Sequence, residues 1–116
     1  MREIGNKAEA AVAKFLHQCG YKIVERNFAC KFGEIDIIAE KDEYLVFVEV
    51  KMRRTEAYGG GAAAVTKSKQ QKIKKTAMLY LMQKNIEPPV RFDVAVVHSD
   101  GAKIRKTDVE VLENAF

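Results

Sequence analysis

The chain has 116 residues, of which 47% are apolar and 31% charged, a composition that excludes a disordered tail and indicates one globular domain over residues 1–116. No apolar run is long enough for a membrane span, and the first residues lack the apolar core of a signal peptide, so we expect a cytoplasmic protein. The net charge of +4 is uneven, since residues 51–75 carry eight basic side chains against one acid. This basic segment predicts a surface for a polyanion, with a solvated, lysine-rich helix face as the alternative.

The first half of the chain predicts one helix followed by three strands. Apolar residues from Ala8 to Cys19 recur at helical spacing and Gly20 follows them, which predicts a helix over residues 3–19. Later apolar runs predict strands over residues 21–28, 34–39 and 44–51. The third run is apolar on both faces and should form a central strand covered on both sides. Because the charged turn at residues 40–43 is short, the second and third strands should pair as an antiparallel hairpin.

The second half predicts a loop, a helix and two further strands. Residues 52–65 contain three consecutive glycines and are expected to form the loop. The helix should run from Thr66 or Ser68, either of which is a suitable N-cap, to residue 84. Its expected buried side consists of Ile73, Ala77, Tyr80 and Leu81, and strands should follow over residues 90–98 and 102–111. The predicted fold is α/β, a mixed central sheet flanked by helices.

Three charged residues interrupt the two apolar strands of the predicted hairpin: Asp36, Glu49 and Lys51. Glu49 and Lys51 share a face because side chains alternate along a strand, and counting outward from the turn places Asp36 opposite Glu49 to within two residues. Two carboxylates on a half-buried face repel each other and are costly to desolvate, and Mg²⁺ would remove both penalties. The lysine could then support an attacking water or neutralise phosphoryl charge. The alternative is a structural ion pair between Lys51 and either acid at the rim of the sheet.

The motif formed by Glu9, Asp36 and Glu49-Val50-Lys51 resembles that of the restriction-endonuclease-like PD-(D/E)XK nucleases, and in order and spacing it is similar to that of archaeal Holliday-junction resolvases. The whole chain resembles the bacterial YraN family. The matching segments are residues 33–38, 46–53, 58–60, 68–70, 91–94 and 114–116. The resemblance implies an αβββαβ core, with Asp36 and Glu49 holding Mg²⁺ or Mn²⁺ and the carbonyl of Val50 as a third candidate ligand. It also implies that Lys51 is the catalytic lysine and that Glu9 completes the acid set.

Several other charged residues have two interpretations. Glu9 lies three residues after Asn6, so the two could instead form a helix capping box. Glu34 shares a face with Asp36 in a regular strand, and it either assists the metal or is an ordinary charge at the start of the strand. Arg91 and Asp93 are interpreted as a structural pair.

Contacts to phosphate are predicted from the basic segment that begins at Lys51. The candidate nucleic-acid-binding residues are Arg53, Arg54, Lys67, Lys69, Gln70 and Lys72. The lysines at the start of the second helix attract phosphate through both their charge and the helix dipole. We therefore expect a Mg²⁺-dependent endonuclease that hydrolyses DNA, with branched or structured DNA as the candidate substrate; a two-fold substrate would favour a homodimer. The alternatives are a catalytically silent nucleic-acid-binding module of the same fold and a protein-interaction domain.

Overall fold

The computed structural model describes residues 2–53, 65–99 and 102–116, with residues 2–5 as backbone only. Its elements in order are α1 (Arg2–Gln18), β1 (Lys22–Cys30), β2 (Gly33–Lys41), β3 (Tyr44–Arg53), α2 (Lys67–Lys84), β4 (Val90–His98), the 3-10 helix η2 (Lys106–Asp108) and β5 (Val109–Leu112). The strands form one sheet in the order β1-β2-β3-β4-β5, in which β3 and β4 are parallel and every other pair is antiparallel. The predicted α/β fold with a mixed sheet is confirmed, and the arrangement is compatible with a restriction-endonuclease-like core.

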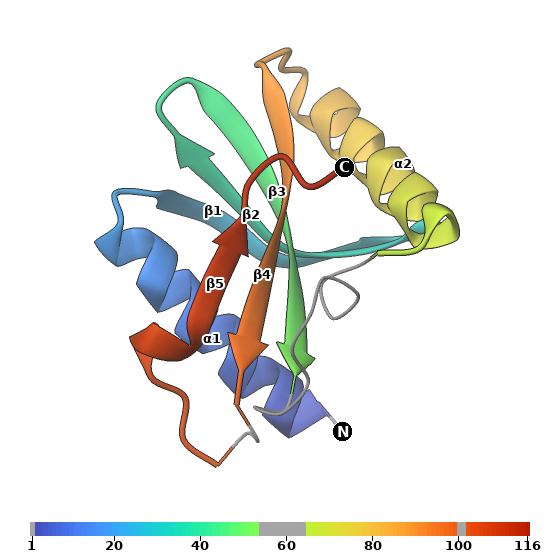
Figure 1. The fold of residues 1–116 in the computed structure, drawn as a ribbon. Coiled ribbons are helices and arrows are strands. Elements are labelled where there is room, and N and C mark those ends of the chain that lie inside the picture. Colours follow the sequence, from blue (N-terminus) through green and yellow to red (C-terminus); the bar gives the residue numbers. More distant parts are fainter. Residues whose placement is uncertain (1, 54–64, 100–101) are drawn as a thin grey trace.

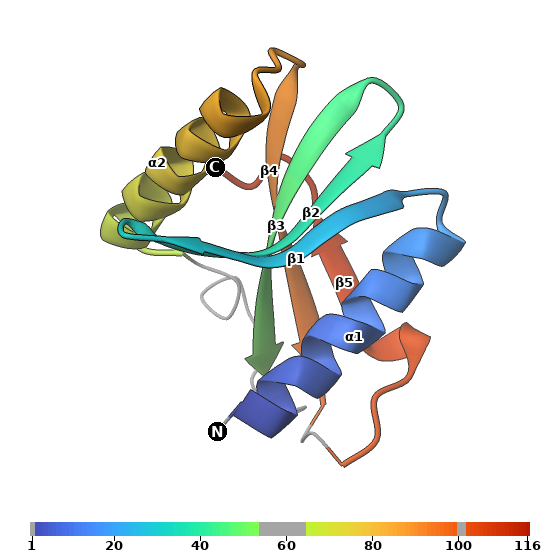
Figure 2. The same cartoon turned by 180° about the vertical axis from the view of Figure 1, so that it is seen from behind.

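The sheet lies between the two helices, which cover opposite faces (Figures 1 and 2). On the α1 face, Ala8, Val12 and Leu16 pack with Ile37, Val48 and Val97. On the α2 face, Ile73, Ala77 and Tyr80 pack with Ile38, Leu45 and Phe47. Strand β3 contributes to both cores, so it is the central, doubly covered strand that its apolar run predicts. Among the described residues, no helix has both the length and the apolar content that crossing a bilayer requires.

Local signals explain most of the element boundaries. Helix α1 stops before Gly20, whose φ of 93° lies in the left-handed region that glycine adopts without strain. The β2–β3 turn passes through Asp42, also left-handed at φ 57°. Thr66 caps α2, because its side chain accepts a hydrogen bond from the backbone N–H of Lys69 at 3.1 Å. The N-cap is therefore Thr66 rather than Ser68.

Several boundary predictions are wrong. Strands β1 and β2 end at Cys30 and Lys41, later than the predicted residues 28 and 39. Met52 and Arg53 belong to β3 and not to the loop, because they pair with Val97 and His98 of β4. Of the rest of the predicted loop, residues 54–64 lie outside the described residues, and Val65 has no regular structure, as predicted. The last strand is limited to Val109–Leu112, since the carboxylate of Asp108 accepts the N–H of Arg105 at 2.8 Å and closes a 3-10 turn where a longer strand was expected.

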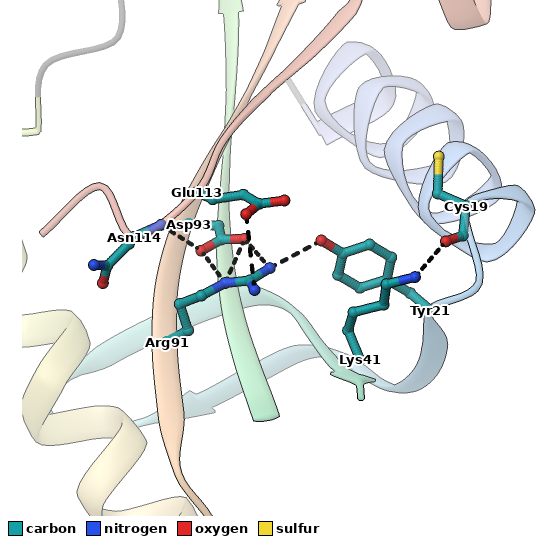
Figure 3. Close-up of polar contacts among 7 residues, drawn as sticks. All are labelled: Cys19, Tyr21, Lys41, Arg91, Asp93, Glu113 and Asn114. Carbon is teal, nitrogen blue, oxygen red and sulfur yellow. Dashed lines mark hydrogen bonds and ion pairs between the residues drawn. The ribbon is translucent and has the colours of Figure 1, made fainter. Parts of the chain in front are cut away.

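A buried ion pair joins β4 to the segment that follows β5 (Figure 3). Asp93 has no exposed surface, and its Oδ2 lies 2.9 Å from Nη2 of Arg91. Asp93 Oδ1 also accepts the backbone N–H of Asn114 at 2.9 Å, while Arg91 donates to the hydroxyl of Tyr21 at 2.9 Å. Hydrogen bonding to Asp93 raises the pKa of Arg91 above its ordinary value, so the guanidinium stays charged. The predicted contact between Arg91 and Asp93 is confirmed, and it has a structural function in the sheet.

The end of the sheet formed by the β2–β3 turn is acidic. A surface groove of about 420 Å³ lies there, lined by Glu40, Asp42, Glu43, Tyr44, Leu45, Ile86, Glu87 and Pro88. Tyr44 and Leu45 begin β3, whereas the basic residue Arg53 ends it. The negative and positive charges thus lie toward opposite ends of the same central strand.

Candidate active site

The candidate site lies where the pairing between β2 and β3 stops. The last paired residues toward this end are Ile37 and Val48, and the next residue on each strand is Asp36 and Glu49. Asp36 continues the contact through its side chain, because its Oδ2 accepts the backbone N–H of Val50 at 2.8 Å. The register confirms that Asp36 and Glu49 lie at the same level of the hairpin, as counting from the turn predicts.

A bend in the β1–β2 hairpin opens the pairing at Asp36. On β1, Asn27 has a left-handed φ of 57°, and its neighbours Arg26 and Phe28 pair with Ile37 and Ile35. Strict alternation would place those two isoleucines on one face, yet Ile37 packs in the α1 core and Ile35 in the α2 core. The tip of the hairpin consequently turns toward α2, as both views show (Figures 1 and 2). This bend separates β2 from the end of β3 and leaves an edge of β3 beside Asp36.

The backbone of Val50 presents its polar groups at that edge. In a β-strand, the N–H and the C=O of one residue point to the same side. The N–H of Val50 is bonded to Asp36, so its carbonyl also faces the Asp36 side, past the last β2 partner. Within the described residues, Oδ1 of Asp36 makes no hydrogen bond. The carboxylate of Asp36 and the carbonyl of Val50 therefore offer oxygen ligands on the same side of β3.

Glu49 is a buried acid with a cation beside it. The residue is only 6% exposed, and its Oε2 lies 3.1 Å from Nζ of Lys69 on α2. Burial first, and then the negative charge of Asp36, raise the pKa of Glu49 above its ordinary value, while the charges of Lys69 and Lys51 act in the opposite direction. The two carboxylates are thus close enough to interact electrostatically. Lys51 lies two residues further along β3 on the face of Glu49.

Glu9 approaches from the other side of the sheet. It is buried at 7% exposure, and its Oε1 lies 3.8 Å from Nη2 of Arg26, the residue that pairs with Ile37. Because α1 covers the face opposite α2, Glu9 and Lys69 flank this part of the hairpin from opposite faces. The capping-box alternative is wrong, since α1 begins at Arg2 and Asn6 lies within the helix. Glu34 pairs with Ala29 near the tip of the β1–β2 hairpin.

The predicted nucleic-acid-binding residues occupy different environments. Lys67 and Lys72 are exposed on α2, whose first turn contains no acid. Gln70 donates from Nε2 to the carbonyl of Val65 at 2.8 Å, so it anchors the chain that enters the helix. Arg53 donates to the carbonyl of Met52 at 2.9 Å. Arg54 lies outside the described residues.

Lys69 has a contact that sequence reasoning did not identify. Its predicted partner was a phosphate, whereas the structure pairs it with Glu49 across 20 positions of sequence. The available signal was the first turn of α2, which combines lysines with no acid although the helix dipole disfavours cations at that end. Such a turn indicates that an anion lies nearby, either in the protein or in a ligand.

The donor atoms of the site suit a small divalent cation. Two carboxylates and a backbone carbonyl are hard oxygen ligands of the kind that Mg²⁺ and Mn²⁺ take, with water completing the shell. In the described part of the chain, no three Asp, Glu, His or Cys side chains gather closely enough to form a metal site by themselves. Asp36, Glu49 and the carbonyl of Val50 are the donors that could hold such a cation, with water or substrate oxygens in the remaining positions.

Comparison with known proteins shows the family of the chain. The family described as "Uncharacterised protein family UPF0102" matches residues 8–97. UPF0102 proteins of Nitrosomonas europaea and Caldicellulosiruptor saccharolyticus are 40% and 41% identical to it, over 100% and 99% of this chain and 98% of each relative. A UPF0102 protein of Clostridium botulinum is 43% identical over 99% of this chain and 94% of its own length. The YraN family is the same family, and the chain belongs to UPF0102.

Proposed function

We propose that this UPF0102 protein is a divalent-metal-dependent endonuclease that hydrolyses phosphodiester bonds in DNA. The observation that carries the proposal is the meeting of Asp36 with the buried Glu49 where the β2–β3 pairing ends. A purely structural site would not be expected to place a second carboxylate beside the buried Glu49, because burial and the charge of Asp36 both raise the cost of ionising Glu49. A bound cation would remove that cost.

The side chains have separate tasks in this proposal. Asp36, Glu49 and the carbonyl of Val50 would hold Mg²⁺ or Mn²⁺. When bound, the cation supplies a Lewis acid that activates water and neutralises phosphate charge. Lys51 follows Glu49 on the same face, so its ammonium donates hydrogen bonds to the attacking water or to a phosphoryl oxygen. Glu9 supports the site from the opposite face.

The basic surface beside the site fits a DNA backbone. Lys67 and Lys72 are exposed on α2, and the helix begins close to Glu49 because Lys69 in its first turn contacts that acid. The N-terminus of a helix attracts phosphate through its dipole and its unpaired N–H groups. Arg53 ends β3 two residues after Lys51. Phosphates that follow this surface would pass over the two carboxylates.

A second candidate is a DNA-binding module without catalytic activity. The ion pair between Lys69 and Glu49 favours it, since the buried acid already has a cation at 3.1 Å. In that case the site would be neutral without metal, and the basic surface alone would bind DNA. The two candidates differ in whether adding a divalent metal leads to cleavage of the DNA.

One set of assays separates these functions. The protein is incubated with linear, flapped and four-way-junction DNA in Mg²⁺ or Mn²⁺, together with Asp36→Asn and Lys51→Ala. Lys22→Gln serves as a charge-matched control, because Lys22 pairs with Glu40 near the β2–β3 turn, away from the site. Size-exclusion chromatography with and without junction DNA tests the homodimer that a two-fold substrate would favour.

Metal-dependent cutting by the wild type and Lys22→Gln, lost in the other two variants, is the expected result. DNA binding with a steep salt dependence and no cutting by any form would refute the nuclease and support the silent module. Failure to bind any DNA at low salt would refute both. A protein partner would then be sought at the exposed methionines of α2, Met78 and Met82, which are 61% and 71% exposed.

A further inference from the structure

We infer that Lys69 is an internal counter-ion that competes with the divalent cation for Glu49, and that metal binding releases it to contact the DNA phosphate. The inference rests on the proposed function and adds a positioning residue to it. It also links the two binding events, of metal and of DNA, through one side chain. The argument depends on how differently the two partners of the ion pair are exposed.

The ion pair joins a buried acid to a solvent-accessible lysine. Nζ of Lys69 lies 3.1 Å from Oε2 of Glu49, and the two side chains are 49% and 7% exposed. The acid is held within the sheet, whereas half of the lysine surface faces water. A lysine side chain has a flexible four-carbon stem, so it can leave the carboxylate at little cost in packing. Glu49 has no comparable freedom.

The backbone at Lys69 is fixed although its side chain is not. The N–H of Lys69 donates to the Thr66 side chain at 3.1 Å, and the neighbouring Gln70 donates to the carbonyl of Val65 at 2.8 Å. The lysine thus starts from a defined point in the first turn of α2. From there its ammonium can reach Glu49 in one orientation, and in others it faces the solvent beside the exposed Lys67 and Lys72.

Metal and lysine cannot share Glu49 without repulsion. Both are cations that need the same carboxylate, and whether they take one of its oxygens or one each, two like charges so close together repel each other in a buried setting. Without metal, Lys69 offsets the charge that burial makes costly. With metal bound, the lysine is displaced to the surface on which phosphate is expected. Metal binding should therefore increase the affinity for DNA, and by thermodynamic linkage DNA should increase the affinity for metal.

The first test measures Mn²⁺ affinity without DNA, from the electron paramagnetic resonance signal of free Mn²⁺. Lys69→Gln should bind Mn²⁺ about fivefold more tightly than the wild type, which corresponds to about 1 kcal/mol, the upper end for a partly exposed ion pair. Lys69→Arg keeps the competing cation and should bind no more tightly than the wild type. Lys75→Gln removes the same charge from an exposed position of the same helix and should change the affinity less than twofold. Asp36→Asn should weaken Mn²⁺ binding at least about tenfold in every background.

The second test measures the coupling of metal and DNA. The affinity for a fluorescent DNA duplex is compared with and without Ca²⁺, a probe for the metal that is not expected to support cutting. The increase caused by Ca²⁺ should be smaller in Lys69→Gln than in the wild type or in Lys75→Gln, because no lysine is released in that variant.

The outcomes distinguish this inference from the proposed function. If the wild type binds Mn²⁺ and cuts DNA, but Lys69→Gln has unchanged or weaker Mn²⁺ affinity, the competition is refuted and the nuclease stands. If neither protein binds Mn²⁺ and neither cuts DNA, the proposed function is refuted and the competition is refuted with it. Tighter Mn²⁺ binding in Lys69→Gln with unchanged DNA coupling would support the competition and refute the release to phosphate.

Discussion

Asp36 combines a structural contact with a proposed ligand role, and two substitutions separate them. Its Oδ2 accepts the N–H of Val50 at 2.8 Å in a part-buried position. Asp36→Asn keeps a side-chain oxygen on a side chain of the same length but removes the negative charge. Asp36→Ala removes both the oxygen and the charge. An effect seen only in Asp36→Ala is therefore due to the lost hydrogen bond. An effect seen in both variants is due to the lost negative charge.

The expected magnitudes follow from these contacts. A buried donor left without its acceptor costs about 1–3 kcal/mol, so we expect Asp36→Ala to lower the free energy of unfolding by about 2 kcal/mol. At about 4 °C per kcal/mol for a domain of this size, the melting temperature should fall by about 8 °C. Asp36→Asn exchanges a charged acceptor for a neutral one but also ends the repulsion of Glu49. Its stability should therefore stay within about 1 kcal/mol of the wild type.

Urea unfolding without metal and Mn²⁺ titration together test this reasoning. Both variants should bind Mn²⁺ at least about tenfold more weakly, while only Asp36→Ala loses stability. Asp42→Asn is the matched control, because Asp42 lies in the turn of the same hairpin at a left-handed φ of 57° that asparagine also adopts. Wild-type Mn²⁺ affinity in Asp36→Asn would refute the ligand role. Wild-type stability in Asp36→Ala would show that the hydrogen bond to Val50 does not hold the strands together.

Three further predictions follow from contacts described above. Asp93→Ala leaves the guanidinium of Arg91, at 15% exposure, without its buried carboxylate, and should lower the free energy of unfolding, measured in urea, by about 3 kcal/mol. Adding Arg91→Met should restore part of the lost stability. If it restores none, the broken ion pair is not the cause of the loss. Because the pKa of Glu49 is raised, the folded protein keeps this proton longer than the unfolded chain, so wild-type stability should decline as the pH rises from the ordinary pKa of 4.5 to the raised value. Glu49→Gln should remove that decline in urea unfolding across this range, and an unchanged pH profile would contradict it. Lys67→Gln and Lys72→Gln should each reduce the slope of log DNA affinity against log salt by about one, whereas an unchanged slope would place the phosphates elsewhere.

The part of the site that lies within one hairpin could be predicted from sequence. A short turn and regular pairing allow residues to be counted outward, and Ile37 opposite Val48 is the register that this counting requires. Alternation then places Lys51 beyond Glu49 on one face. The central position of β3 followed in the same way from an apolar run on both faces, because only a strand covered on both sides can bury such a run.

Contacts between distant elements could not be predicted in this way. Helical spacing places Lys69 four residues before Ile73, on the side of α2 that packs on the sheet, but only the packing itself identifies Glu49 as its partner. The bend at Asn27 was equally hidden, since a single left-handed asparagine inside an alternating strand carries no turn signal. That bend moves Ile35 to the α2 core, a change of face that strict alternation does not allow.

The separation of charge along β3 has a consequence for how the molecule would meet a ligand. Carboxylates of the β2–β3 turn surround the groove at one end of the strand, and basic side chains follow its other end and the start of α2. In the field of a DNA rod, a body charged in this way turns its basic end forward before contact, so unproductive collisions become less frequent. The effect is greatest at low ionic strength and weakens as salt is added, because at about 0.1 M the field is screened over about 10 Å. If the protein binds DNA as proposed, the acidic turn, although remote from the candidate site, would thus help to orient the molecule for encounter.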